Sequence, residues 1–317
     1  MNRIACVGEA LIDFVAQTQL ADVGASEYFL RAAGGAVSNV AVGIARLGGR
    51  STFAGAIARD PFGTFLLRTL ARENVDVDAT RLVDASTTLA FVARGPAGAR
   101  DFFFVRNPGA DSLLQPDDLD AAMLKNARVV HFGGVLMSSE PGRSASLRAA
   151  EIGRSAGALV SFDPNARGAL FASADEMRDE LRSACRRAAL VKCSIDDLST
   201  MGVDPDDPKP LFADGVEALV VTDGDGECRW FASDGALGKA LPPQVEPIDT
   251  TGAGDAFMAA LLVRMVEHHD ARPTSQALDD CVRYACAAGA LATLQEGAIP
   301  SMPHAADVET LLAKARA

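Results

Sequence analysis

Five short apolar runs recur along the chain, and each one ends in glycine or polar residues. The runs occupy residues 4–7, 129–132, 159–162, 190–193 and 219–222, and helix-like stretches separate them. Runs of this length that are apolar on both faces are typical of parallel strands covered by helices. The pattern therefore predicts an α/β fold with a doubly wound, mostly parallel sheet flanked by helices.

The residues that follow these runs indicate where a ligand should bind. They are Gly8 with Asp13, Gly133 with Gly134, Asp163 with Asn165, Ser194 with Asp197, and Thr222 with Gly224. In open parallel sheets, ligands bind beyond the carboxyl ends of the strands. We therefore expect these side chains to meet in one cleft.

The region between residues 86 and 110 follows a different pattern. Residues 88–94 and 100–106 flank the turn-like Gly95-Pro-Ala-Gly98, which predicts a β-hairpin. With residues 14–31 the hairpin is expected to form a small sheet inserted in a single domain of residues 1–317. An ordinary edge hairpin and a lid that covers substrate and excludes water both fit this pattern.

Composition restricts the partners of the chain. Asp and Glu number 42 against 30 Lys and Arg in 317 residues, and this excess argues against nucleic acid or an anionic membrane as partner. No stretch approaches the roughly 18 apolar residues of a membrane span, and the first residues do not resemble a secretory signal. We therefore expect a cytoplasmic protein. The six cysteines have no metal-ligand spacing, so we expect them to be reduced core thiols.

The most informative motif is Asp-Thr-Thr-Gly-Ala-Gly-Asp-Ala-Phe at residues 249–257, which leads into an apolar helical pattern. The backbone N–H groups of Gly252, Ala253 and Gly254 can point into one concavity at the positive end of the helix dipole. Such a concavity suits a phosphate or a developing oxyanion.

Asp255 directly follows this small-residue loop, and two roles are open for it. A carboxylate at a helix start can be an N-cap. Beside an anion-binding loop, it can instead take the proton from a sugar hydroxyl that attacks a γ-phosphate. No Walker-type lysine follows the loop.

A second motif, Gly-Gly-Ala-Val-Ser-Asn-Val-Ala at residues 34–41, precedes a helical pattern at 41–47 that stops at Gly48-Gly49. By itself this stretch predicts a loop and a helix. Asn39 would then satisfy nearby backbone groups.

Together the two motifs resemble the two signatures of the ribokinase-like (PfkB-type) carbohydrate kinases, in the same order, and the likeness extends from Gly8 to Pro303. The resemblance implies a ribokinase-like fold with a small β-sheet lid and an ATP-dependent sugar kinase. It also implies that the backbone of residues 252–254 forms an anion hole and that Asp255 is the general base.

The resemblance assigns the sugar side of the site as well. It implies that Gly34, Gly35 and Asn39 contact sugar hydroxyls, and that Asp13 grips a diol, for which a carboxylate is suited.

Residues 101–111, with Arg106 and Asp111, resemble the fructokinase branch, as do Asp163, Asn165 and Arg167. Arg106 would reach sugar oxygens from the lid, or else be a solvated surface arginine. Asp163 and Asn165 would lie by the sugar and phosphate path, or else be turn residues. Fructose is therefore the preferred substrate in this interpretation.

On the nucleotide side the resemblance implies contacts by Lys192, Ser194, Asp197, Thr222, Gly224, Gly252, Gly254 and Gly297. Magnesium is expected to arrive with ATP and to keep several waters. The loop at Gly297, with Asp249 and Thr251, implies a site for a monovalent cation such as K⁺.

The reaction expected is transfer of the γ-phosphoryl group of ATP to a primary hydroxyl, giving fructose 6-phosphate. Kinases for 2-keto-3-deoxygluconate, ribose or a nucleoside such as aminoimidazole riboside are the alternatives within the family. A non-catalytic sugar-binding regulator is the alternative from another class. A dehydrogenase is disfavoured because no Gly-x-Gly-x-x-Gly follows the first strand. An exposed apolar lid edge would support a homodimer.

Overall fold

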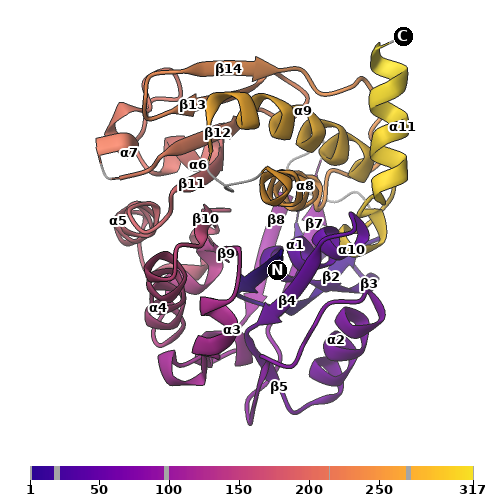
Figure 1. Cartoon of the computed structure of the whole chain (residues 1–317). Coiled ribbons are helices and arrows are strands. Elements are labelled where there is room, and N and C mark those ends of the chain that lie inside the picture. Colours follow the sequence, from indigo (N-terminus) through magenta and orange to yellow (C-terminus); the bar gives the residue numbers. More distant parts are fainter. Residues whose placement is uncertain (1, 18–21, 96–99, 214, 269–272, 317) are drawn as a thin grey trace.

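An eight-stranded sheet runs through the main body of the chain (Figure 1). The structure is a computed structural model that describes residues 2–17, 22–95, 100–213, 215–268 and 273–316. In spatial order the strands are β14 (Leu237–Ala240), β13 (Cys228–Ala232), β12 (Ala218–Thr222), β11 (Leu190–Ser194), β10 (Leu159–Asp163), β9 (Val129–Gly133), β1 (Arg3–Val7) and β4 (Arg50–Ala54).

The six strands from β12 to β4 are parallel, and only β13 and β14 pair in the antiparallel sense. The five apolar runs of the sequence are β1, β9, β10, β11 and β12, and they lie side by side. Their side chains are buried on both faces because helices cover both. The predicted doubly wound α/β fold is confirmed.

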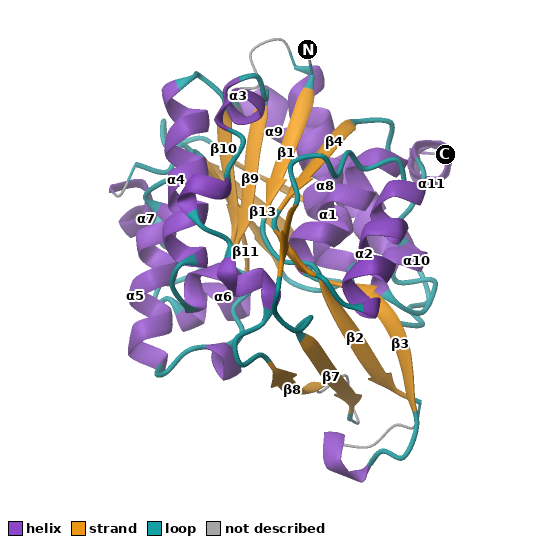
Figure 2. Cartoon of the chain, turned by 90° about the horizontal axis from the view of Figure 1, so that it is seen from below, coloured by secondary structure: helices purple, strands orange, loops and turns teal. Residues whose placement is uncertain are grey.

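Helices form a layer on each face of this sheet (Figure 2). One layer contains α3 (Ala121–Lys125), α4 (Gly142–Ser155), α5 (Ala174–Cys185), α6 (Ile195–Thr200) and α7 (Lys209–Ala213). The other contains α1 (Ala36–Arg46), α8 (Ala253–Glu267) and α9 (Ser275–Ala292), with α2 (Pro61–Arg72), α10 (Ala298–Ser301) and α11 (Ala305–Arg316) outside them. α8 is buried almost all round, since it packs against both α1 and α9.

A second sheet of four strands projects from the edge of the main body (Figure 2). Its order is β3 (Phe29–Gly34), β2 (Leu11–Ala16), β7 (Leu89–Arg94) and β8 (Arg100–Val105). The predicted small sheet is therefore present, and its strands extend beyond the expected residues 14–31 to include 11–13 and 32–34. Residues 18–21 and 96–99 lie outside the described residues, and the predicted turn at 95–98 falls there except for Gly95. A further pair, β5 (Ala56–Ala58) and β6 (Arg81–Val83), lies apart from both sheets.

α1 begins at Ala36, five residues before the helical pattern that the sequence predicts, so Asn39 lies within the helix. The N-cap residue Gly35 has φ 105° and supplies no side-chain cap. The carboxylate of Glu9 accepts a hydrogen bond from the Val37 N–H at 3.3 Å instead. A cap that comes from another part of the chain leaves no local signal, which is why the sequence placed the helix start too late.

All six cysteines are buried and none forms a disulfide, as expected for reduced core thiols. Among the described residues, no helix combines the length and the apolar character that crossing a membrane requires.

Leu66 on α2 is 2% exposed and packs in the core. We expect Leu66→Ala to lower the free energy of unfolding by about 2–5 kcal/mol, since the lost methyl groups leave a cavity. Leu237→Ala, at a side chain that is 70% exposed on β14, is the matched control and should change it by less than about 0.5 kcal/mol. Urea unfolding measures both, and equal effects would contradict the core placement.

Candidate active site

Two cavities open at the carboxyl ends of the parallel strands. The first, of about 240 Å³, lies between the main sheet and the small sheet. The predicted residues that line it are Asp13, Gly35, Asn39, Asp163, Asn165, Arg167, Lys192, Thr251, Gly252, Gly254 and Asp255. We call it the sugar-side cavity, after the residues that the resemblance assigns to the sugar.

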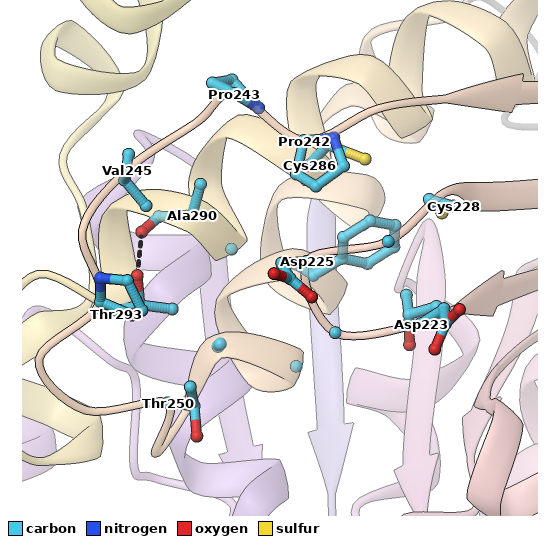
Figure 3. A pocket seen from close by; sticks show the side chains of 18 of the residues that line it. Asp223, Asp225, Cys228, Pro242, Pro243, Val245, Thr250, Cys286, Ala290 and Thr293 are labelled. Carbon is cyan, nitrogen blue, oxygen red and sulfur yellow. Dashed lines mark hydrogen bonds between the residues drawn. The ribbon is translucent and has the colours of Figure 1, made fainter. Parts of the chain in front are cut away.

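The second cavity, of about 370 Å³, lies between β12, β13, α8 and α9 (Figure 3). Thr222, Gly224, Ala253 and Gly254 are the predicted residues that line it. Its walls are largely apolar, with Phe257, Pro242 and Val245 among them, while Asp223 and Asp225 lie on the turn after β12. An apolar slot with a few polar groups at one end is typical of a site for a nucleotide base. We call it the nucleotide-side cavity.

The loop before α8 separates the two cavities, and Thr250 and Gly254 line both. Gly252 is the N-cap residue of α8, with φ 80° and no side-chain cap. A Cβ on Gly252 would lie 2.8 Å from the Cα of Ala298, so only glycine fits there. Ala253 N donates to Thr250 O at 3.3 Å, so the predicted concavity of three N–H groups is not fully open. The N–H groups that follow it in the first turn of α8 point, without a capping side chain, at the junction of the cavities, where an anion would bind.

Asp255 stands in the first turn of α8 and is not its N-cap. Its Oδ2 accepts a hydrogen bond from Asn39 Nδ2 at 2.8 Å. Burial raises the pKa of Asp255 to about 7, Asn39 opposes the rise, and the nearby charge of Asp163 adds to it. A carboxyl group with this pKa in the uncapped first turn of a helix is suited to general-base chemistry near neutral pH.

Asp13 reaches the sugar-side cavity from β2, and Gly34 makes room for it, because a Cβ on Gly34 would lie 2.0 Å from Asp13 Oδ2. Gly35 packs against the backbone instead, since a Cβ there would lie 2.7 Å from the carbonyl oxygen of Glu9. Gly34 does not itself line the cavity. Its role in the structure is to leave space for the carboxylate next to it.

Lys192 and Asp163 form a buried ion pair on neighbouring strands, with 3.0 Å between Nζ and Oδ2. Burial lowers the pKa of the Lys192 ammonium, but Asp163 and Asp197 outweigh it and the net pKa is raised. The ammonium lies beside the anion-binding loop, since a Cβ on Gly254 would be 3.1 Å from Nζ. A positive charge is thus held where the two cavities meet.

Asn165 and Arg167 follow β10 and face the small sheet. Asn165 has φ 39°, a left-handed conformation that asparagine tolerates better than most residues. The Arg167 guanidinium lies 5.2 Å from the ring centroid of Phe102 on β8. Phe102 and Phe104 line the same cavity, so this contact links the two sheets across it.

Ser194 and Asp197 were predicted on the nucleotide side, but they line neither cavity. They form a capping box at the start of α6. Asp197 Oδ2 accepts from Ser194 N and Oγ, and Oδ1 accepts from Ala166 N at 2.8 Å. In the structure Asp197 fixes the loop that carries Asn165 and Arg167, so its predicted contact with nucleotide or metal stays a prediction.

Arg106 also lies away from both cavities. Its side chain is 7% exposed and forms an ion pair with Asp111, while its NH1 donates to Ser138 Oγ at 2.7 Å. It is therefore neither a solvated surface arginine nor a residue of the sugar-side cavity here. It joins the end of β8 to the main body, and contact with the sugar stays a prediction.

Asp249 joins the two loops predicted to surround a monovalent cation. Its Oδ1 accepts from the N–H and hydroxyl of Thr251, and its Oδ2 accepts from Gly297 N at 2.9 Å. Asp249 and Gly297 do not line either cavity, although Thr251 does. The contacts hold the loop before α8 against the loop before α10.

The sequence analysis missed several residues that line the cavities. Glu9 lies two residues after the end of β1, fully buried, and burial raises its pKa to about 7. Its position after a strand end was the signal that could have identified it. Phe102 and Phe104 alternate along β8, and this alternation predicts that they share a face. Cys228 and Cys286, which line the nucleotide-side cavity, left no such signal.

Comparison with known proteins agrees with this geometry. The family model described as pfkB family carbohydrate kinase matches residues 1–305. The chain is 40% identical to "Fructokinase-2" of Zea mays over 321 residues, covering 99% of this chain and 95% of that protein.

Two solved structures are similar over almost the whole chain. One is a fructokinase from Xylella fastidiosa with bound ATP, with TM-score 0.89, 31% identity and 99% of both chains covered. The other is a fructokinase from Vibrio cholerae O395 with fructose, ADP and calcium ion bound, with TM-score 0.87, 31% identity and 98% and 99% covered. The chain belongs to the pfkB family of carbohydrate kinases.

Proposed function

We propose that the protein is a fructokinase, which transfers the γ-phosphoryl group of ATP to the primary hydroxyl of fructose and gives fructose 6-phosphate. The observation that carries the proposal is the placement of Asp255 and the open N-terminus of α8 at the junction of the two cavities. A base and an anion-binding loop are then next to each other, between a polar cavity and an apolar one.

The residues act as follows in this proposal. Asp255 accepts the proton of the primary hydroxyl as its oxygen attacks the γ-phosphorus, and the bond to the bridging oxygen of ADP breaks. Asn39 fixes the orientation of the base through its hydrogen bond. The N–H groups of the first turn of α8, with Lys192 beside them, stabilise the negative charge that develops. The small sheet acts as a lid that excludes water.

Fructose is favoured because several proteins described as fructokinases match the chain over almost its whole length. Three of them from maize and rice are 40% identical over 98–99% of the chain. The sugar-side cavity offers hydroxyl partners in Asp13, Asn39 and Asn165 and aromatic faces in Phe102 and Phe104. Polar groups that fix orientation among apolar walls are typical of a small-ligand site.

ATP binds in the nucleotide-side cavity in this proposal, and Mg²⁺ comes with it. Among the described residues no group of three or more His, Cys, Asp or Glu side chains is placed to hold a metal ion. That fits an ion that is held mainly by phosphate oxygens and water. Asp163 has a buried Oδ1 without a hydrogen-bond partner and is the carboxylate of this chain that would hold the ion's water shell. The ion would supply charge neutralisation of the phosphates.

ADP release from MgATP should be strong with fructose and weak with ribose, 2-keto-3-deoxygluconate and aminoimidazole riboside. Asp255→Asn, which keeps the size of the side chain, should lower turnover about 10²- to 10⁴-fold because the base is lost. Preference for another sugar would overturn fructose and keep the kinase. No turnover with any of them would favour the sugar-binding regulator, and an unaffected Asp255→Asn variant would exclude Asp255 as base.

We propose that K⁺ binds between the loop before α8 and the loop before α10 and activates the enzyme. Asp249 holds these loops together, and one similar fructokinase structure, a double mutant from Vibrio cholerae O395, has a potassium ion bound. Activity should fall when K⁺ is replaced by tetramethylammonium at constant ionic strength, and Asp249→Ala should weaken this response. Equal activity with and without K⁺ would contradict the proposal.

We also propose that the outer part of the small sheet forms a homodimer. Phe103 and Val105, 55% and 46% exposed, lie on the face of the small sheet that is turned away from the sugar-side cavity, and Tyr28 and Leu30, 71% and 55% exposed, lie at its β3 edge. Analytical ultracentrifugation should show a dimer for the wild type and a monomer for Phe103→Asp. Leu237→Asp, at an equally apolar exposed position on β14, should stay dimeric. A monomeric wild type would rule the interface out.

A further inference from the structure

Glu9 is a fully buried carboxyl group to which the proposed reaction gives no role. Glu9 lies in the segment that connects β1 of the main sheet to β2 of the small sheet, and it lines the sugar-side cavity. Its Oε2 has no hydrogen-bond partner within the described chain. Burying a carboxyl group with one oxygen that lacks a hydrogen-bond partner costs free energy. The contacts that Glu9 does make therefore indicate why a carboxyl group is present here.

Besides a hydrogen bond to its own backbone, the carboxyl group of Glu9 contacts the start of α1. Glu9 Oε1 accepts from Val37 N at 3.3 Å, and Val37 is the second residue of the helix. The N-cap residue Gly35 has no side chain to do this. The carbonyl oxygen of Glu9 also faces Gly35, since it would be 2.7 Å from a Cβ at that position. Glu9 thus packs its carbonyl against the glycine turn and caps the helix start with its carboxylate.

The first turns of α1 lead directly to the base. Asn39 lies two residues after Val37, is 4% exposed, and donates to Asp255 Oδ2 at 2.8 Å. No other hydrogen bond of the Asn39 side chain is present in the described structure, because its Oδ1 has no partner. The position of Asn39 therefore depends on where the backbone of α1 begins.

We propose that Glu9 is a positioning residue for the general base: its carboxyl group fixes the first turn of α1 and so sets the point from which Asn39 holds Asp255. This inference rests on the proposed role of Asp255. It assigns to Glu9 an effect on turnover that a helix cap elsewhere in the chain would not have.

The charge of Glu9 has a second effect, on the pKa of Asp255, which can be separated from the effect of the contact with α1. The charged groups that act on Glu9 are Asp111, which follows β8 and is paired with Arg106, and Asp255 on α8. Burial first, and then these two carboxylates, raise the pKa of Glu9 to about 7. The coupling is reciprocal, so an ionised Glu9 also disfavours the ionised form of Asp255. Asp163 acts on Asp255 in the same direction, and Lys192 and Arg167 act in the opposite one.

Two substitutions separate the contact from the charge. Glu9→Gln keeps an oxygen acceptor for Val37 N–H and removes the charge, so turnover at pH 8 should stay close to that of the wild type. The acid limb of the kcat/KM profile should move to lower pH, by about half a unit, because the pKa of Asp255 falls. Glu9→Ala removes both, and kcat should fall about 10- to 100-fold as the base loses its position. The KM for ATP should change less than about twofold.

Asp120→Ala is the matched control. Asp120 caps α3 by accepting from Ala122 N and Met123 N, and α3 carries no residue of either cavity. This variant should lower the melting temperature and leave kcat and the pH profile unchanged.

The outcomes distinguish the inference from the function on which it rests. If Glu9→Ala lowers only the melting temperature, as Asp120→Ala does, Glu9 is a structural cap and the inference is wrong. If Glu9→Ala does not fold, Glu9→Asp decides, because it keeps the charge but is one methylene shorter and draws the carboxylate away from Val37 N–H. Its kcat should fall about 10-fold, and a kcat equal to that of the wild type overturns the inference. A wild type that is inactive with every sugar would instead overturn the proposed function, and the inference with it.

Discussion

The hydrogen bond between Asn39 and Asp255 joins parts of the chain that are 216 residues apart, and the site depends on it. It connects α1, which follows the small sheet, to α8, which begins at the anion-binding loop. α1 and α8 also pack along each other on one face of the main sheet (Figure 1). The packing fixes the position of the two helices relative to each other, so the hydrogen bond from Asn39 can orient the carboxylate of Asp255.

Several charged side chains are buried around this hydrogen bond, and their arrangement makes that burial tolerable. Four carboxyl groups, those of Glu9, Asp13, Asp163 and Asp255, line the sugar-side cavity against two cations, Lys192 and Arg167. Burial and like charge raise the pKa of Glu9 and Asp255 to about 7, while Lys192 pairs with Asp163. A stable core would not be built this way. Such an excess of acidic groups is expected where a base must be ionised near neutral pH and release its proton afterwards.

The sequence predicted the parts of the fold that have a local pattern. The five apolar runs identified β1, β9, β10, β11 and β12, because a strand buried on both faces must be apolar throughout. The motif at residues 249–257 identified the loop, since only small residues allow that turn. Contacts between distant segments were not predictable in the same way. Arg106 pairs with Asp111 and Asp197 caps α6, which local spacing did not distinguish from contacts with a ligand.

The two helices of the site start in the same irregular way, at a glycine with positive φ and without a capping side chain. By the usual rules both starts are weak, because the first N–H groups lack acceptors. α1 obtains one from Glu9, so its start is closed and can hold Asn39 in place. α8 obtains no side-chain cap, and although Ala253 N donates to Thr250 O at 3.3 Å, the N–H groups that follow it are open to an anion. The two starts therefore differ in whether another segment supplies the cap. The motif at residues 34–41 does not contain that information, since the acceptor comes from a residue 28 positions away from Val37.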